Sequence, residues 1–457
     1  MNPRQRSCLS GLLLLAALSG CSWRTYTQAP LDLPQAAEQE TTRRLDDSSV
    51  QAALAASGQD TTGWPNIVWT RDKLATALLS FHPDQRAARA KVSATRVRIK
   101  SGLKSDPPEL TTSLEHHSQT NDGKNSPWAV GAGLQWQLVD GSVKTALAVA
   151  ANIEMQDAEL AAGETAWRLY RALGSALLER QVASGRALLA ATGLELATAR
   201  DKSVSVRERY GVATAMEVQL TAQRLQDARR EVAEADAAII AAQAKLATAL
   251  AVPYESLAKM RLADWPITEV PDATTTRQLA LNNQLEFARV RMQYELAEAD
   301  LRLQVAKQYP NLKLGPGLLW SQGDTVWQFS FSLPAALLNR NQTAIENAQA
   351  QRSAQGAAVL AKQSALIHEA ERLRLHALAL TEPLKIARTS LKAAQSQLQL
   401  NKAQFEAGNV DALAVIDARS LQLQAERAVF DTHTALMQAL WDLEAVTQSP
   451  LTAANSP

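Results

Sequence analysis

Residues 128–138 read Trp-Ala-Val-Gly-Ala-Gly-Leu-Gln-Trp-Gln-Leu, and this stretch decides the fold class of the chain. Each even-numbered position holds an apolar side chain, and each odd-numbered position is small or polar. Successive side chains of a β-strand point to opposite faces, so this alternation predicts a strand with one apolar face. Similar alternation occurs in three other segments, most weakly in the first. The sequence therefore predicts strands at 110–118, 128–139, 312–320 and 325–334.

These strands suit a bilayer. Lengths of about 9–11 residues, apolar outer faces, polar inner faces and terminal tryptophans are typical of transmembrane β-barrels. Four strands cannot close a barrel, because the smallest bacterial barrels have about eight and lipid tolerates no open sheet edge. Three chains would pool about twelve strands. The alternative is a β-subdomain packed against the protein's own helices in the periplasm. The side chains expected to face lipid are Trp128, Val130, Leu134, Trp136, Trp320, Trp327, Phe329 and Phe331.

Very long helices follow the strands. No proline occurs in 141–209, and only Pro383 occurs in 341–407, so each run predicts a helix of roughly 100 Å. Return helices are predicted at 214–251 and 411–447. In the first return helix, apolar residues recur every seven positions, which is typical of coiled-coil packing. These residues are Val218, Leu225, Val232, Ile239 and Leu246, and the second return helix has Ile416, Leu423, Phe430 and Met437.

The chain contains two copies of one unit, because landmarks recur at an offset of about 200 residues. Arg89 matches Arg289, and Gly211 matches Gly408. Each copy predicts a helix of about 30 residues, two strands, a very long helix, a tight turn and a return helix. The sequence thus divides into a polar lead with weak structure signals, two structural repeats and a tail, at 21–69, 70–264, 272–447 and 448–457.

Residues 1–20 are typical of a bacterial export signal, because Arg4 and Arg6 precede a short apolar run. The following Leu18-Ser19-Gly20-Cys21 resembles the lipobox of bacterial lipoproteins. That resemblance implies cleavage before Cys21 and its acylation, for example with palmitate. Ser22 follows the cysteine, and by lipoprotein sorting rules this implies the outer membrane. An ordinary secretory signal with a chance cysteine is the alternative.

Composition and motifs exclude several function classes. Lys and Arg total 47 against 46 Asp and Glu, so no basic field favours nucleic acid. No apolar run reaches the 18 or more residues that a transmembrane helix needs. The pair His368-Glu369 lacks a second zinc-binding histidine, because Arg372 occupies that position. His116 and His117 alone do not complete a metal shell. We therefore predict neither an enzyme nor a cofactor or metal site.

Several features together resemble the TolC-like outer membrane factor family over residues 70–447. They are the element order, the repeat, the two glycine turns, the strand entry Gln308-Tyr309-Pro310-Asn311-Leu312, and the junction from Ser332-Leu333-Pro334 to Asn339-Arg340-Asn341. The resemblance implies a mostly α-helical fold with a small β part. Long coiled-coil-like helices would form an α-barrel, and four strands per chain would join a shared trimeric 12-stranded transmembrane β-barrel. It also implies a homotrimer that docks, through a periplasmic adaptor (membrane fusion) protein, onto an inner-membrane pump of the resistance-nodulation-division type.

The same resemblance implies that the glycine turns are periplasmic tips that receive the adaptor. By position, the docking residues are Tyr210, Gly211, Val212, Thr214, Ala407, Gly408, Asn409 and Asp411. Carboxylates repeated around a threefold axis form anionic rings, so Glu217, Asp411 and Asp417 are candidate gate residues, with helix capping or simple solvation as the alternative. We expect Arg209 to bridge such a carboxylate and to hold the tip closed.

The sequence thus predicts the outer membrane channel of a tripartite efflux system. It would be a lipid-anchored, passive trimeric duct that extends into the periplasm and exports small molecules or ions delivered by its partners. No phosphate-binding Gly-x-x-x-x-Gly-Lys-Ser/Thr loop is present, so energy must come from the pump. Met-rich and His-rich runs are absent, which gives metal transport no specific support. The alternatives are the outer membrane component of type I protein secretion and a periplasmic structural lipoprotein without a pore.

Overall fold

The computed structural model describes residues 25–102, 107–118, 126–257, 260–263, 269–309, 311–321, 324–332 and 340–451. The predicted signal peptide and Cys21 lie outside these ranges, as do residues 333–334 of the last predicted strand. The chain divides into two compact units, Met1–Arg43 and Arg44–Pro457. The first contains α2 (Leu33–Thr42), which begins where the Asp32 carboxylate accepts a hydrogen bond from the Gln35 amide at 3.0 Å. All further elements belong to the second unit.

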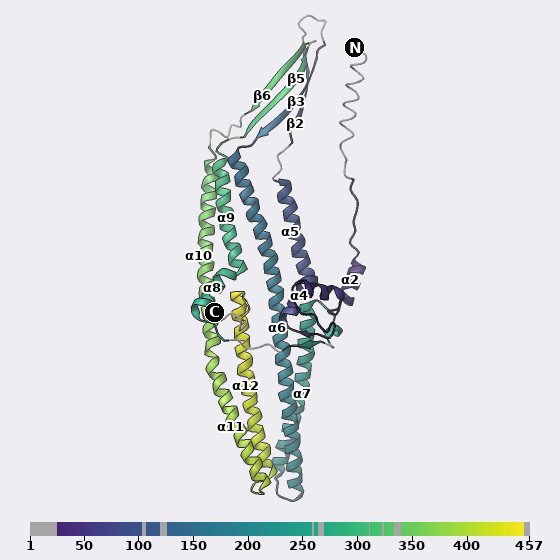
Figure 1. Cartoon of the computed structure of the whole chain (residues 1–457), viewed down its shortest axis with the longest axis vertical. Coiled ribbons are helices and arrows are strands. Elements are labelled where there is room, and N and C mark those ends of the chain that lie inside the picture. The colour runs from purple at the N-terminus through teal and green to yellow at the C-terminus, as the bar shows by residue number, and fades with distance from the viewer. Residues whose placement is uncertain are drawn as a thin grey trace. The chain divides into compact units, whose positions relative to one another are not determined.

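Four antiparallel strands form one sheet in the order β2-β3-β5-β6 (Figure 1). They are β2 (Glu109–His116), β3 (Trp128–Leu138), β5 (Leu312–Ser321) and β6 (Asp324–Ser332). The central pair joins the two repeats, because β3 pairs with β5 and places Val130 opposite Trp320. The predicted fold class, mostly helical with a small four-stranded part, is confirmed.

The helices next to the sheet follow the order of the strands. Contacts join α5 (Pro83–Gly102) to α6 (Gly141–Arg209), α6 to α9 (Leu285–Ala306), and α9 to α10 (Gln342–Ala379). Each helix is connected to one strand: α5 precedes β2, α6 follows β3, α9 precedes β5 and α10 follows β6. Because these connections are short, neighbouring strands are joined to neighbouring helices, and the helices have the same order as the strands.

Farther from the sheet, beyond the first residues of α9, α6 has different neighbours. Here α6 packs on α7 (Ala215–Leu250) and α12 (Ala412–Thr447), and α12 packs on α11 (Thr381–Glu406). The predicted heptad positions of α7 form its least exposed face, with Leu225 and Leu246 buried. Gly211 and Gly408 reverse the chain with φ of 71° and 74°, a left-handed conformation that favours glycine.

The predicted helix 341–407 differs from the structure, in which α10 ends at Ala379 and α11 begins at Thr381. Pro383 explains the interruption, because proline has no amide hydrogen for the Ala379 carbonyl and its ring crowds that group. The leading helices of both repeats are likewise divided, since α4 (Arg71–Phe81) ends before Pro83 and α8 (Ala273–Asn283) ends before Gln284.

The lead at 21–69, whose sequence gives only weak structure signals, contains regular elements in its second part as well as α2. Residues after 47 form α3 (Ser48–Ala56) and β1 (Val68–Trp69), and β1 pairs in parallel with β4 (Arg261–Leu262). Leu54 is fully buried in a core that includes Leu74, Leu78, Leu173 and Leu250. A strand of two residues shows no alternation, so the sequence pattern could not reveal it.

A buried charged group ties three helices together at this core. Glu444 of α12 accepts hydrogen bonds from the Arg71 guanidinium at 3.1 Å and from the Tyr170 hydroxyl at 3.0 Å. The Trp441 indole donates to Ser175 at 3.1 Å and its ring packs against Gly174, where a Cβ atom would approach within 2.3 Å. Burial raises the pKa of Glu444, and the neighbouring Arg71 opposes this rise. The group therefore joins α4, α6 and α12.

Candidate functional site

One face of the sheet is apolar and exposed. The strand register brings the even residues of β2, β3 and β5 and the odd residues of β6 to this face. Each of the eight side chains predicted to face lipid is at least 40% exposed, and Phe329 reaches 81%. An apolar patch of this extent on a soluble surface is unusual and indicates a lipid or protein partner. The register adds four exposed leucines to it, Leu110, Leu114, Leu314 and Leu318.

The opposite face is polar and closely packed. Gln135, Gln328 and Ser330 lie on it, and the Glu109 carboxylate lies 3.8 Å from the Lys313 ammonium. Glycines admit these side chains, since a Cβ atom at Gly131 would lie 2.4 Å from the Ser113 hydroxyl. The sheet thus has one face suited to hydrocarbon and one suited to water.

Both edges of this sheet are open. Within the described chain, β2 pairs only with β3, and β6 pairs only with β5. The outer backbone groups of β2 and β6 therefore need partners, and lipid cannot supply hydrogen bonds. The sheet becomes complete in a membrane only when further strands join β2 and β6.

The structure places the predicted docking residues in two exposed turns. Tyr210 and Val212 are 80% and 62% exposed in the turn between α6 and α7. Thr214 and Glu217 form a capping box that begins α7, and this contact lowers the pKa of Glu217. In the second turn, which contains Gly408, the Asp411 carboxylate caps α12 at the Ala414 amide, 3.0 Å away. Helix capping, the alternative considered for the gate carboxylates, is thus observed for Glu217 and Asp411.

The arginine predicted for the gate requires correction. Arg207, not Arg209, contacts the carboxylate of Asp411, with 2.8 Å between Nη1 and Oδ2. Two residues correspond to about 200° around a helix, so Arg209 points away from α12. Arg200 lies two turns before Arg207 on the same face and pairs with Asp417. The seven-residue spacing of Arg200 and Arg207 was the sequence signal that could have identified this face.

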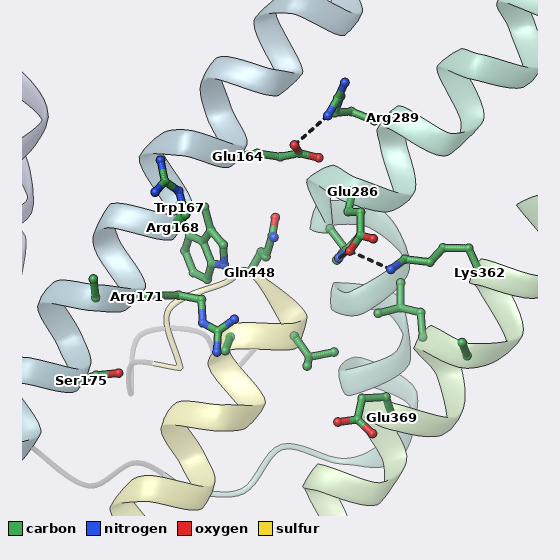
Figure 2. A pocket seen from close by; sticks show the side chains of 16 residues that line it. Glu164, Trp167, Arg168, Arg171, Ser175, Glu286, Arg289, Lys362, Glu369 and Gln448 are labelled. Carbon is green, nitrogen blue, oxygen red and sulfur yellow. Dashed lines mark hydrogen bonds and ion pairs between the residues drawn. The ribbon is translucent and has the colours of Figure 1, made fainter. Parts of the chain in front are cut away.

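A polar cleft of about 960 Å³ lies among α6, α9, α10 and α12, and the sequence did not reveal it (Figure 2). At one end of it, Arg289 of α9 pairs with two carboxylates of α6, with 2.9 Å from Nε to Asp157 and 2.9 Å from Nη1 to Glu164. These carboxylates, Asp157 foremost, raise the pKa of Arg289. Lys362 pairs with Glu286 at 2.7 Å. The charged residues of the cleft thus bind neighbouring helices to each other.

Neither catalytic nor metal chemistry is apparent in the described part of the chain. No group of three or more His, Cys, Asp or Glu side chains there could hold a metal ion. His368 and His376 lie on α10, and the His117 ring lies beside Ser321, with 3.4 Å between Nε2 and Oγ.

Among the residues that the structure describes, no helix combines the length and hydropathy needed to cross a bilayer.

Solved channels share the fold. The outer-membrane channel OprN is 18% identical, with 94% of this chain and 99% of that chain covered and a TM-score of 0.67. VceC from Vibrio cholerae is 15% identical, with coverage of 84% and 97% and a TM-score of 0.66. MtrE from Neisseria gonorrhoeae, solved in its open state, is 16% identical, with coverage of 94% and 99% and a TM-score of 0.62. No curated protein matches the chain.

The family comparison covers both repeats. The pattern of the outer membrane efflux protein family matches residues 74–252 and 276–447, which is most of the chain. Channels of this family form trimers and work with an adaptor and a pump, and they are not enzymes. With its amphipathic open sheet and its long helices, the chain belongs to the outer membrane efflux protein family and is an outer membrane efflux channel of tripartite systems.

Proposed function

We propose that three copies of this chain form one duct, in which each copy contributes four strands to a barrel of about twelve. The observation that carries the proposal is an exposed apolar face on a sheet with two open edges. Pairing β6 of one copy with β2 of the next removes every open edge. Because the helices follow the strand order, the same operation brings α10 of one copy beside α5 of the next. Closing the strands therefore also closes the helical wall.

The duct is passive in this proposal. The eight apolar side chains, from Trp128 to Phe331, face lipid, and the glutamines, serines and glycines of the opposite face line the pore. A pore lined by small polar groups binds its cargo weakly, which allows rapid passage. An adaptor docks at the turns that contain Gly211 and Gly408, and a pump of the resistance-nodulation-division type delivers small molecules or ions. Acylated Cys21 anchors the chain to the outer membrane.

Bilayer recordings test the proposal. The purified protein is expected to run as a heat-modifiable trimer and to produce channels in planar bilayers. A monomer that inserts without conductance would contradict the proposal and favour a structural lipoprotein. Deleting the gene is expected to lower tolerance to toxic compounds. Loss of a secreted protein with unchanged tolerance would favour type I secretion instead.

Breaking the tip ion pair is expected to favour the open duct. An exposed pair contributes about 0.2–1 kcal/mol, so Arg207→Ala or Asp411→Ala should shift the closed-to-open ratio about 1.5- to 5-fold per pair. Single-channel recordings of each variant measure the open fraction. Arg209→Ala is the matched control, since Arg209 lies on the other side of α6, and it should behave as wild type. Equal effects of Arg207→Ala and Arg209→Ala would reject this role for the pair.

A further inference from the structure

Cations gather where the helices meet the sheet. Lys100 lies in the last turn of α5, and Lys144 lies in the first turn of α6. Lys307 ends α9, and Arg340 lies two residues before α10. We call these four residues the girdle. Each girdle side chain is exposed, and the ion pairs of the described residues involve none of the four. All four helix ends adjoin the same sheet.

The helix dipole explains only half of the girdle. A cation at a helix C-terminus is stabilised by the dipole, which accounts for Lys100 and Lys307. At an N-terminus a cation is unfavourable, and both Lys144 and Arg340 occupy N-terminal positions. Lys144 and Arg340 therefore need a negatively charged partner, since the helix dipole does not stabilise them.

Among the residues that the structure describes here, the nearby carboxylates have other hydrogen-bond or ion-pair partners. The adjoining terminal turns of α5, α6, α9 and α10 contain no Asp or Glu. The Asp140 carboxylate caps α6 at the Ser142 amide, 2.9 Å away, and Glu109 lies beside Lys313 on the sheet. Glu346 lies more than a turn farther from the sheet than Arg340. Among the described residues, these helix ends therefore carry more positive than negative charge, since Asp140 and Glu109 offset only Lys313 and one girdle cation.

The girdle also adjoins the apolar face. Lys144 follows β3 by six residues, and Leu138 at the end of that strand is 51% exposed. Tyr309 lies between α9 and β5 and is 71% exposed. An aromatic side chain and cations directly beside an apolar band are typical of a membrane interface. Asn341 donates a hydrogen bond to the Gln304 carbonyl at 2.9 Å, so the ends of α9 and α10 that carry Lys307 and Arg340 lie side by side.

We propose that the girdle binds phosphate-bearing lipid headgroups at the periplasmic surface of the outer membrane, an inference that rests on the proposed insertion of the sheet. The phosphates supply the anion that Lys144 and Arg340 lack. In a trimer the girdle would present twelve cations around the barrel. Binding of these anionic headgroups would thereby fix how deeply the barrel lies in the bilayer.

Lipid competition tests the girdle. The trimer is reconstituted with brominated phosphatidylglycerol or brominated phosphatidylcholine, whose bromines quench the tryptophans of the apolar face. Wild type is expected to prefer the anionic lipid. Replacing Lys100, Lys144, Lys307 and Arg340 together by Gln should reduce that preference about fivefold or more. Each basic residue near a membrane surface adds to the attraction for anionic lipid. The matched control replaces four exposed cations far from the sheet, Lys202, Arg229, Lys392 and Lys402, by Gln and should keep the wild-type preference.

Conductance in the same vesicles separates the two proposals. A girdle variant that conducts but retains the full anionic-lipid preference would overturn the girdle and leave the duct intact. A wild-type protein without conductance or tryptophan quenching would overturn the duct itself. Inorganic phosphate, added at fixed ionic strength, is expected to leave the preference unchanged. If phosphate abolished it, the girdle would bind a soluble anion rather than lipid.

Discussion

Glu444→Ala is expected to destabilise the protein by about 3–5 kcal/mol, because it removes one partner of a buried ion pair. Glu444 is 3% exposed and receives hydrogen bonds from both Arg71 and Tyr170. Without the carboxylate, the Arg71 guanidinium keeps its desolvation cost and loses this counter-charge. Because Arg71 belongs to α4, Tyr170 to α6 and Glu444 to α12, the loss also loosens the core that joins these helices. Thermal unfolding in detergent, followed by circular dichroism, measures the effect.

Two controls make this result specific. Glu382→Ala removes an exposed carboxylate that lies 3.6 Å from Lys385, and its effect should stay within about 0.5 kcal/mol.

Glu444→Gln keeps the shape of the side chain but not its charge. Burial raises the folded-state pKa of Glu444 above 4.5, so proton binding favours the folded state. This contribution is fully present below the unfolded pKa and is lost as the pH rises through the folded pKa. Wild type should therefore gain stability on acidification relative to Glu444→Gln, and equal pH profiles would contradict the account.

Phe329→Arg is expected to impair membrane insertion by about 2–4 kcal/mol, because it places a charge near the middle of β6 on the face that we propose contacts lipid. Phe329 pairs with Pro316 and is 81% exposed in the single chain, so no protein contact shields the new charge. The measurement is the fraction of heat-modifiable trimer recovered from outer membranes.

The neighbouring residue provides the matched control for this face. Gln328 lies on the opposite side of β6, where Gln328→Arg should insert like wild type and change the ion selectivity of the channel. The reverse outcome, in which Gln328→Arg fails to assemble and Phe329→Arg assembles normally, would show that the sheet faces the other way.

Local sequence patterns predict much of the fold. The alternation at 128–138 predicts β3 because each residue of a strand reports its own face, and the structure has that strand at Trp128–Leu138. The proline-free run at 141–209 coincides with α6, and Gly211 and Gly408 lie at the turns that their left-handed backbone permits. In these cases the physical cause acts among neighbouring residues. Lipid contact stays a prediction from this alternation, and adaptor docking and acylation of Cys21 stay predictions from the resemblances to the channel family and to the lipobox.

Other features depend on partners far apart in the chain. Arg71 and Glu444 are 373 residues apart, and Arg207 and Asp411 are 204 apart. From the sequence we assigned the tip contact to Arg209, whereas the structure has Arg207, because which of the two faces α12 depends on the rotation of α6 against its neighbour. The cleft around Arg289 exists only because α6, α9, α10 and α12 pack side by side. The girdle exists only because four helix ends meet the same sheet. The sequence by itself determined the sheet strands, the long helices and the turns between them, since periodicity and chain reversal are local. The tertiary structure decided the pairings, since charge contacts require helices brought together by packing.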